Sequence, residues 1–370
     1  MRVLITLGTS AGGVGRHVEG LVRGLVERGH IVVVACPTSV AERFGLDALA
    51  SLVVPVDVAE RPSPVDDAGA VRELRRLARG AEVVHAHGLR SAALVVLATR
   101  QLPVPVVATL HNAAPEGRAL RAVYGVLERV VARGCDLVLG VSADLVARMD
   151  ALGARRTGLA VVAAARPRTA DRDRYAVHAD LGIGARTALA VVVARLAPQK
   201  GLDLLLDAHA ELGDLDLLTV VAGDGPLREP LQRRIDTEGL PVRLLGARDD
   251  VPDLLSAADV VVSSARWEGQ PVGLQEALHA GAAIVATDVG GTAAVVGDAA
   301  VLVPPGDPIS LSRAVRDVVT YGQVRDELRS RAVERAGELP SEADAVAAAL
   351  AAYAEVGAGG GPPPRPRSAG

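Results

Sequence analysis

Hydrophobic positions follow two alternating patterns along most of the chain. Short runs of Val, Leu, Ile and Ala are apolar at nearly every position, which predicts strands buried on both faces of a sheet. The longer segments between them place apolar residues three and four positions apart, as in Arg16–Arg28 and Ala119–Arg133, which is typical of amphipathic helices. This alternation predicts an α/β protein whose parallel sheets are covered by helices.

The predicted strands fall into two series. The first comprises Val3–Leu7, Ile31–Cys36, Val83–His85, Val106–Leu110, Leu137–Leu139 and Leu159–Ala163. The second comprises Ala188–Ala194, Leu217–Ala222, Val242–Leu245, Val260–Ser263, Ala283–Ala286 and Val301–Val303. Between them, Ala165–Arg174 is polar and basic and contains proline, which is typical of a linker. We therefore expect two doubly wound, Rossmann-like domains, residues 1–165 and 175–335, facing a central cleft.

The end of the chain carries one more helical pattern and a tail. Ser341–Val356 is predicted to form a helix, with Ser341 as its N-cap. Residues 357–370 consist largely of glycine and proline, so we expect this tail to be disordered.

Composition narrows the class of protein. A chain of 370 residues suits two α/β domains, and its net charge of −4 argues against nucleic-acid binding. The mean hydropathy is +0.28, but no uncharged apolar run reaches the roughly 18 residues of a spanning helix. The apolar start is too short for a signal peptide. Cys36 and Cys135 lie in or beside apolar runs and are expected to be buried free thiols, so the sequence predicts a cytoplasmic protein.

Candidate chemistry gathers where the predicted strands end, which is where open α/β sheets bind ligands. Gly12–Gly15 follow the first strand, His111 follows Val106–Leu110, Arg195 follows Ala188–Ala194, Gly223–Pro226 follow Leu217–Ala222, and Glu268 follows Val260–Ser263. The glycine loop lets backbone amides approach an anion, although a plain tight turn explains it too. The loop lacks the Gly-x-Gly-x-x-Gly spacing of a dinucleotide site. The second strand also ends without the acidic residue that would bind an adenosine ribose, so a dinucleotide site is disfavoured.

Two cations mark the loop that begins the second series. Lys200 is the only lysine in a chain that otherwise uses arginine, and it lies five residues after Arg195. Gly201 follows it where a Walker loop needs Ser or Thr, so a nucleotide-triphosphate loop is excluded. The pair suits a phosphate group, and ordinary surface charges are the alternative.

Glu268 and Glu276 give the strongest signal. Gly269, Pro271 and Gly273 break regular structure, so Glu268 is expected on a loop and Glu276 one turn inside a helix. A glutamate favoured by the helix dipole and a solvated loop glutamate are the alternative. A cation pair and a carboxylate pair together predict a site for a phosphorylated sugar, with carboxylates binding hydroxyl groups.

Histidines and aspartates give weaker signals. His111 is equally a core histidine or a ligand contact by position. His85 and His87 share one face of a strand, but no third ligand follows at metal-site spacing. The Asp-x-Asp strings beginning at Asp171 and Asp214 are not placed to bind a metal, so no metal site is expected.

Taken in order, these motifs resemble retaining glycosyltransferases of family 4, which have the GT-B fold. The resemblance covers about residues 1–335 and rests on the following segments: Gly-Gly-Val at 12–14, His-Ala-His-Gly at 85–88, His111, Arg195-x4-Lys200-Gly, Gly-Asp-Gly-Pro at 223–226, Arg-Asp-Asp-Val-Pro at 248–252, and Glu268-x7-Glu276. The chain departs from the family at Ala163–Arg166, where Asn-Gly is common, and at Gly290–Ala294, where Pro-Glu is common.

The resemblance implies a role for each matched residue. Arg195 and Lys200 would clamp the donor diphosphate, with the backbone of Gly13 beside it. Glu276 would bind the ribose and Glu268 the hydroxyls of the transferred sugar. His111 would contact the sugar near the reacting centre; the residues near the base would be Arg248, Asp250 and Val251. The first domain would bind the acceptor and the second the donor, and the helix at residues 341–356 would pack back on the first domain.

The expected activity is metal-independent, retaining transfer of a sugar from a UDP- or GDP-linked donor to an acceptor hydroxyl, with no separate cofactor. Cell-envelope glycoconjugates or small glycosides are the expected products. A non-catalytic scaffold subunit and a sugar-nucleotide epimerase remain alternatives. If the acceptor is lipid-linked, Ala119–Arg133, with Arg121, Arg129 and Arg133 around an apolar face, would contact the inner face of the membrane; a helix packed on the core is the alternative.

Overall fold

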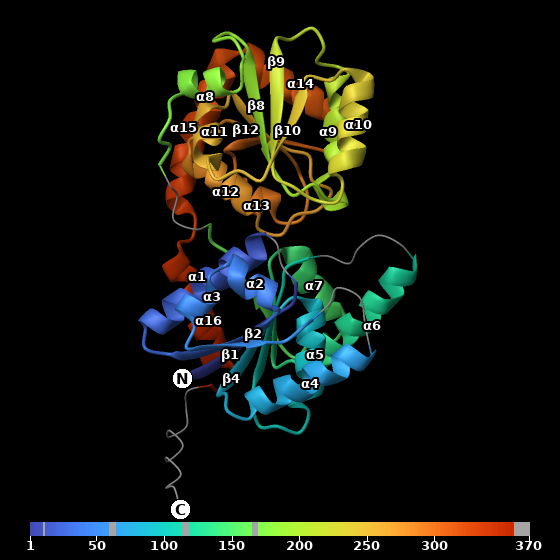
Figure 1. Cartoon of the computed structure of the whole chain (residues 1–370), viewed down its shortest axis with the longest axis vertical. Helices are drawn as coiled ribbons and strands as arrows, with labels where there is room; N and C mark the ends of the chain where they lie inside the picture. The colour runs from blue at the N-terminus through green and yellow to red at the C-terminus, as the bar shows by residue number, and fades with distance from the viewer. Residues whose placement is uncertain (10–11, 59–63, 113–117, 165–168, 359–370) are drawn as a thin grey trace, which may run out of the picture. The chain divides into compact units, whose positions relative to one another are not determined.

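The computed structural model describes residues 1–9, 12–58, 64–112, 118–164 and 169–358. The chain divides into two compact units, and each is described by itself (Figure 1). Unit 1 consists of Met1–Val162 and Glu342–Gly370, and unit 2 of Ala163–Ser341. Most of the expected tail (359–370) and the first part of the expected linker (165–168) lie outside the described residues.

Unit 1 is built on a seven-stranded parallel sheet with the order β3-β2-β1-β4-β5-β6-β7. The strands are β1 (Arg2–Leu7), β2 (Ile31–Cys36), β3 (Leu52–Pro55), β4 (Val83–His87), β5 (Val106–Leu110), β6 (Leu137–Gly140) and β7 (Thr157–Leu159). The chain runs outward from β1 to β3 and then returns to β4. The order therefore reverses between β1 and β4, and ligands of such sheets bind at that point.

Helices cover both faces of this sheet (Figure 1). They are α1 (Gly13–Glu27), α2 (Thr38–Arg43), α3 (Leu46–Leu49), α4 (Pro64–Ala78), α5 (Leu89–Thr99), α6 (Arg118–Gly134), α7 (Ala143–Ala151) and, from the end of the chain, α16 (Glu342–Glu355). The last helix belongs to the core of unit 1, because Val346 and the fully buried Tyr353 pack with β1 and β2 residues. Glycine allows this close packing: a Cβ on Gly24 of α1 would lie 2.6 Å from Val346 Cγ2.

Two predictions about the strands of unit 1 were wrong, and both concern edges. The strand β3 was missed, because Leu52–Pro55 is short, ends in proline and is only partly buried. The expected strand Leu159–Ala163 is instead β7, at Thr157–Leu159. The apolar run after it is buried at Ala160 and Val162 without forming a strand, so its hydrophobicity reports burial rather than sheet pairing.

Unit 2 repeats the design with a six-stranded parallel sheet in the order β10-β9-β8-β11-β12-β13. The strands are β8 (Ala188–Val193), β9 (Leu217–Ala222), β10 (Val242–Gly246), β11 (Val260–Ser263), β12 (Ile284–Thr287) and β13 (Ala300–Val303). The order reverses between β8 and β11. All six predicted strands of the second series are found within one residue of these bounds, and two doubly wound parallel-sheet units are thus confirmed.

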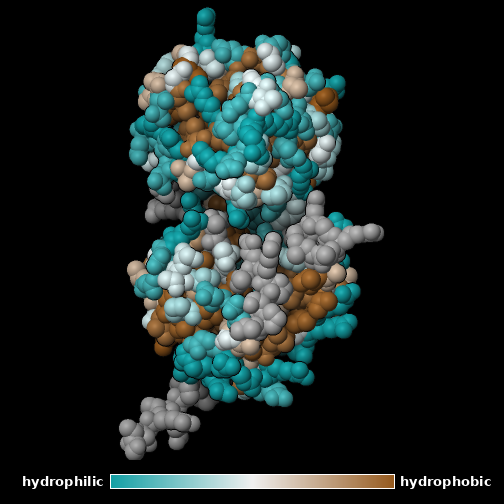
Figure 2. All heavy atoms as spheres, turned by 45° about the vertical axis from the view of Figure 1, so that its right-hand side comes forward, coloured by the Kyte–Doolittle hydropathy of each residue, from teal (hydrophilic) through white to brown (hydrophobic). Residues whose placement is uncertain are grey.

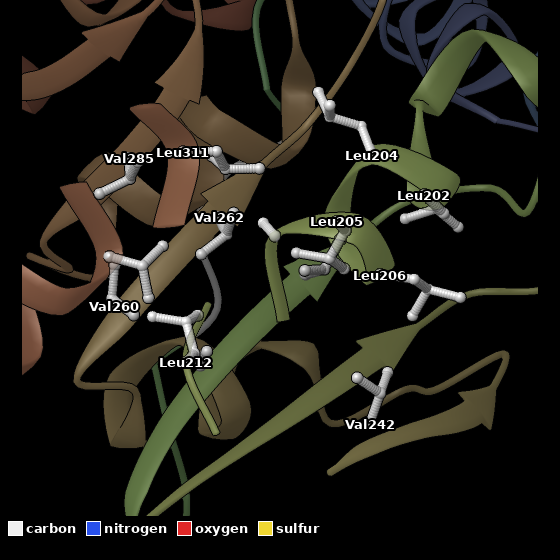
Figure 3. Packing of buried hydrophobic residues seen from close by; sticks show 14 of the residues in the cluster. Leu202, Leu204, Leu205, Leu206, Leu212, Val242, Val260, Val262, Val285 and Leu311 are labelled. Atoms are coloured by element: carbon white, nitrogen blue, oxygen red, sulfur yellow. The ribbon is translucent and has the colours of Figure 1, made fainter. Parts of the chain in front are cut away.

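The helical elements of unit 2 lie on both faces of its sheet. They are α8 (Arg174–Asp180), the short 3₁₀ helix η1 (Pro198–Lys200), α9 (Leu202–His209), α10 (Arg228–Glu238), α11 (Val251–Ala257), α12 (Val272–His279), α13 (Thr292–Val296), α14 (Pro308–Thr320) and α15 (Gly322–Glu338). Along β8 the side chains alternate between two cores: Ala190 and Val192 on one face, Leu189 and Val191 on the other. Figure 3 shows part of the first core, where leucines of α9 gather with valines of β10, β11 and β12.

Candidate active site

The loops that follow β8 and β11 lie next to each other, because these strands pair at the point where the sheet order reverses. Lys200 ends η1 in the first loop, and Glu268 lies in the second. The Lys200 Nζ forms an ion pair with Glu268 Oε1, and their side chains are 25% and 10% exposed. The structure therefore brings together the single lysine and one of the two predicted glutamates.

Backbone contacts hold these two loops together. The amide of Arg266 donates to the carbonyl of Gln199 at 2.8 Å, and the Ser264 hydroxyl donates to the carbonyl of Lys200 at 3.1 Å. Gly201 has a φ of +56°, and a Cβ there would lie 2.1 Å from the backbone carbonyl oxygen of Ser264. Glycine at this position is therefore required both by conformation and by space.

A second glycine turn fixes the backbone of Glu268. The amide of Gly291 donates to the Glu268 carbonyl at 3.0 Å. The preceding Gly290 has a φ of +54°, and a Cβ there would lie 1.9 Å from the same oxygen. The turn after β12 thus fixes the backbone position of Glu268.

Arg195 differs from Lys200 in its surroundings. Its side chain is exposed and has no ion pair in the described part of the chain. Its loop is held by the turn after β9, because Leu196 exchanges backbone hydrogen bonds with that turn: its amide donates to Asp224 at 3.0 Å and its carbonyl accepts from Leu227 at 2.9 Å. The backbone is thus fixed, while the guanidinium is available to an anion.

Glu276 lies one turn inside α12 and Glu268 on the preceding loop, as the sequence predicted. A Cβ on Gly273 would lie only 3.3 Å from the Val193 carbonyl, so the start of α12 closely approaches the end of β8. Glu276 is partly buried and follows Gly273 by one turn on the same helix face. The amino end of α12 adds a partial positive charge beside the Arg195 loop.

Arg248 and Asp250 belong to a charge network. Arg248 donates to both Asp250 oxygens, at 2.7 and 2.6 Å, and these bonds lower the pKa of Asp250. Arg172 forms an ion pair with Asp250 and donates to Asp253 at 2.8 Å. The network ties the start of unit 2 to α11, whose first residue is Val251. A role near the base stays a prediction for all three residues.

A cavity of about 230 Å³ adjoins this network. It is lined by Thr169, Asp171, Asp249, Asp250, Pro252 and Asp253. The acidic lining disfavours a phosphate and suits a neutral or cationic group.

Unit 1 carries a histidine cluster where its own sheet order reverses. His87 ends β4, His111 follows β5, and His17 lies in α1. The His87 Nδ1 and His111 Nε2 lie 3.0 Å apart, and the His17 ring centroid is 5.6 Å from that of His87 and 5.7 Å from that of His111. Burial lowers the pKa of His17 to about 4, and burial with neighbouring imidazoles lowers the pKa values of His87 and His111 well below their ordinary value. The cluster is therefore neutral at physiological pH.

His85 connects this cluster to the end of the chain. Its Nδ1 lies 2.8 Å from the Tyr353 hydroxyl and its Nε2 lies 2.8 Å from the Thr109 hydroxyl. Its ring centroid is 4.2 Å from that of His87, and burial, with a smaller contribution from repulsion by protonated His17, lowers the pKa of His85 to about 3. Helix α16 therefore supports the histidine cluster directly.

His111 is buried, but one of its two ring nitrogens can still bond to a ligand. It is 8% exposed, yet its Nδ1 has no partner in the described part of the chain. Gly13 is exposed and begins α1, so its amide lies at the amino end of a 15-residue helix. The roles expected for both residues stay predictions.

The sequence did not predict that His17 and His87 would surround His111, or that Tyr353 would bond to His85. The available signal was the His-Ala-His segment on the strand before His111, since adjacent parallel strands bring their carboxyl ends together. Among the described residues, no three His, Cys, Asp or Glu side chains are arranged as ligands of one metal ion. No helix in the same residues is both long and apolar enough to cross a membrane.

Comparisons with known proteins agree with this architecture. Residues 12–165 match the family described as glycosyl transferase 4-like domain, and residues 173–337 match glycosyl transferases group 1. The alpha-D-kanosaminyltransferase of Streptomyces kanamyceticus is 29% identical over 318 residues, covering 78% of this chain and 81% of the relative. The D-inositol 3-phosphate glycosyltransferase of Geodermatophilus obscurus is 31% identical over 317 residues, covering 74% and 67%.

A solved structure shows the same fold over nearly the whole chain. Anabaena HepE in complex with UDP and glucose superposes with a TM-score of 0.83 at 19% identity, covering 96% of this chain and 100% of that one. With both halves matched by glycosyltransferase families and the same fold found across both, the chain belongs to the GT-B glycosyltransferases and is a hexosyl-transferring enzyme.

Proposed function

We propose that this enzyme moves a sugar from a nucleoside-diphosphate donor to an acceptor hydroxyl with retention of configuration, without a metal ion. Unit 2 binds the donor and unit 1 the acceptor. The observation that carries the proposal is the arrangement at the reversal point of unit 2, where Lys200 pairs with Glu268 and Arg195 of the same loop has no ion pair among the described residues. A ligand with a phosphate and hydroxyl groups uses all three charges.

The chemistry explains why cations are needed there. Breaking the bond between sugar and phosphate places negative charge on the departing diphosphate. Preorganised donors aimed at developing charge lower the barrier to reaction. Arg195 and Lys200 supply positive charge from the loop after β8, and the amino end of α12, which approaches the end of β8, adds to it. Glu276 then binds the ribose. Glu268 gives up part of its contact with Lys200 and accepts hydrogen bonds from hydroxyls of the sugar.

The motif places no additional carboxylate as a covalent nucleophile, so we infer transfer on one face of the sugar. The choice of a UDP-linked donor is supported by HepE, whose solved complex contains UDP and glucose. A GDP-linked donor is the alternative. For the acceptor, the relative named for D-inositol 3-phosphate favours a small polyol or glycoside, and a cell-envelope glycoconjugate is the second candidate.

Nucleoside diphosphates should stabilise the protein without added metal. We expect thermal unfolding in UDP, GDP, ADP or TDP to show one nucleotide that adds about 2.7 kcal/mol at 100 times its Kd, with no further gain from Mg²⁺. Arg195→Ala should abolish the shift. Arg266→Ala is the matched control, because Arg266 is an exposed arginine of the same site region that is paired with Asp203.

Absence of a shift with every nucleotide would contradict donor binding and favour a scaffold subunit. A shift that depends on Mg²⁺ would contradict metal independence. The stabilising nucleotide then chooses the sugar nucleotides for a transfer assay. Conversion of the donor without any acceptor would identify an epimerase instead.

We also propose that α6 contacts an anionic membrane surface. Val123 and Val126 are 39% and 59% exposed, and Leu97 of the adjacent α5 is 52% exposed. Arg121, Arg129 and Arg133 are exposed on the same helix. Figure 2 shows apolar side chains on the side of unit 1 that carries these helices. Exposed apolar side chains flanked by arginines suit the headgroup region of anionic lipids.

Val126→Glu should reduce co-sedimentation with anionic vesicles several-fold, because it removes apolar contact and adds repulsion. Val333→Glu is the matched control, since Val333 is 63% exposed on α15 of unit 2. Equal binding of the wild type to anionic and neutral vesicles, or an unchanged Val126→Glu variant, would refute the contact.

A further inference from the structure

His87 is a buried histidine that the proposed chemistry does not use. It is 2% exposed, and its Nδ1 lies 3.0 Å from His111 Nε2. Its other nitrogen, Nε2, is buried without a partner in the described residues. Both rings are neutral because burial lowers their pKa values. A neutral imidazole carries one N–H, so only one of the two rings donates across this contact.

The orphaned Nε2 decides which ring donates. A proton on His87 Nε2 would bury an N–H without an acceptor, which costs about 1–3 kcal/mol. A proton on His87 Nδ1 instead leaves a lone pair without a partner on Nε2. Buried N–H groups without an acceptor are rarer in proteins than buried acceptors without a donor. The favoured arrangement therefore has His87 Nδ1–H donating to His111 Nε2. The proton of His111 must then reside on Nδ1, the nitrogen that has no partner in the described part of unit 1.

We propose that His87 is a positioning residue, which holds His111 in the Nδ1–H tautomer so that His111 presents a hydrogen-bond donor to the ligand. The inference rests on the proposed function, in which His111 contacts substrate. It excludes Nδ1 of His111 as a general base toward an acceptor hydroxyl at neutral pH. A donor at this nitrogen instead stabilises an oxygen of the sugar.

The ring of His85 packs against His87, and the partners of His85 fix its orientation and its protonation. The Tyr353 hydroxyl is buried and has His85 Nδ1 as its partner, so Tyr353 donates to it. His85 is then protonated on Nε2 and donates to the Thr109 hydroxyl. His85 is thus locked from both sides, and its ring lies against that of His87. Helix α16 is therefore connected to His111, the candidate catalytic histidine, through the rings of His85 and His87.

The proposal is tested first by nitrogen chemical shifts of the full-length protein labelled with ¹⁵N-histidine. The chain has eight histidines, so His111→Gln assigns its signals by subtraction. We expect the wild-type protein to show His111 protonated on Nδ1 and unprotonated on Nε2. The reverse pattern would overturn the proposal, and this readout needs no substrate.

Two variants at one position then separate the tautomer from packing. His87→Asn keeps an N–H donor near the position of Nδ1, and we expect kcat within about tenfold of wild type. His87→Asp offers only acceptor oxygens, so His111 should switch to the Nε2–H form and kcat should fall by 10²-fold or more, with KM changing less. His209→Asn is the control, because His209 is a buried histidine of unit 2 bonded to Thr219 at 2.9 Å.

Equal activity of the Asn and Asp variants would overturn the proposal. If His87→Asp fails to fold, the wild-type spectrum still decides the tautomer. Failure of the proposed function looks different: the wild type would bind no nucleoside diphosphate and transfer no sugar, whatever the state of His111.

Discussion

Replacing Lys200 with alanine is expected to lower kcat/KM for sugar transfer by about 10²–10³-fold. Lys200 is the only lysine of the chain, and its loop is fixed by backbone contacts to the Glu268 loop. Its ammonium group is therefore preorganised for the role that we propose, which is to stabilise the departing diphosphate. Lys200→Arg is also expected to lower transfer, because a planar guanidinium differs in shape from a compact ammonium group.

Stability must be measured alongside activity. Lys200→Ala leaves Glu268, 10% exposed, without its cation, and an unpaired, largely buried carboxylate is destabilising. The double variant Lys200→Ala/Glu268→Gln should recover part of the lost Tm without recovering transfer. That result would separate the cost of burying a charge from the loss of catalysis.

Arg195→Ala gives a cleaner test of the same mechanism. Because the Arg195 side chain has no ion pair in the described residues, its loss should leave Tm nearly unchanged while lowering kcat/KM by a similar 10²–10³-fold. Arg266→Ala should retain near wild-type activity. Wild-type turnover in Lys200→Ala or Arg195→Ala would contradict the assignment of the donor site.

Acid should destabilise unit 1 well before most carboxylates are protonated. Burial lowers the pKa of His85 from 6.5 to about 3. The unfolded chain then binds more protons than the folded chain between these values, so stability is complete above about pH 6.5 and is lost as the pH falls. One such histidine contributes a slope of about 1.4 kcal/mol per pH unit in that window. His17, His87 and His111 shift in the same direction and add to the effect.

Urea unfolding at pH 7.5, 6.5, 5.5 and 4.5 measures this slope. Hydrogen exchange of the amides of β4 and β5 should show increased opening at the lower pH values, because these strands carry His85, His87 and Thr109. His85→Gln should be less stable at pH 7.5 and show a flatter dependence on pH. An identical slope in the variant would show that the buried histidine is not responsible.

The sequence predicted the buried strands well because local pattern reports burial. Runs of Val, Leu and Ile leave little choice when every side chain must avoid water, and β2, β5, β9 and β11 have the predicted bounds. The two edge strands of unit 1 are short and only partly buried, so this constraint is weak there. For that reason β3 was missed and β7 was misplaced, although each pairs with a neighbour along one side.

The sequence also placed the candidate residues at the carboxyl ends of strands, since a loop must follow each strand and its glycines and charges are visible there. It correctly set Glu268 on a loop and Glu276 in a helix. It showed that Lys200 was unusual, but not what the lysine would contact.

Only the tertiary structure decided the partners. Lys200 meets Glu268 because β8 pairs with β11, across 68 residues of sequence. His87 meets His111 because β4 pairs with β5, and Tyr353 reaches His85 from 268 residues away. A short motif records the preference of its own backbone and side chains. The order of strands, which sets these distances, is decided by how all the apolar faces pack together.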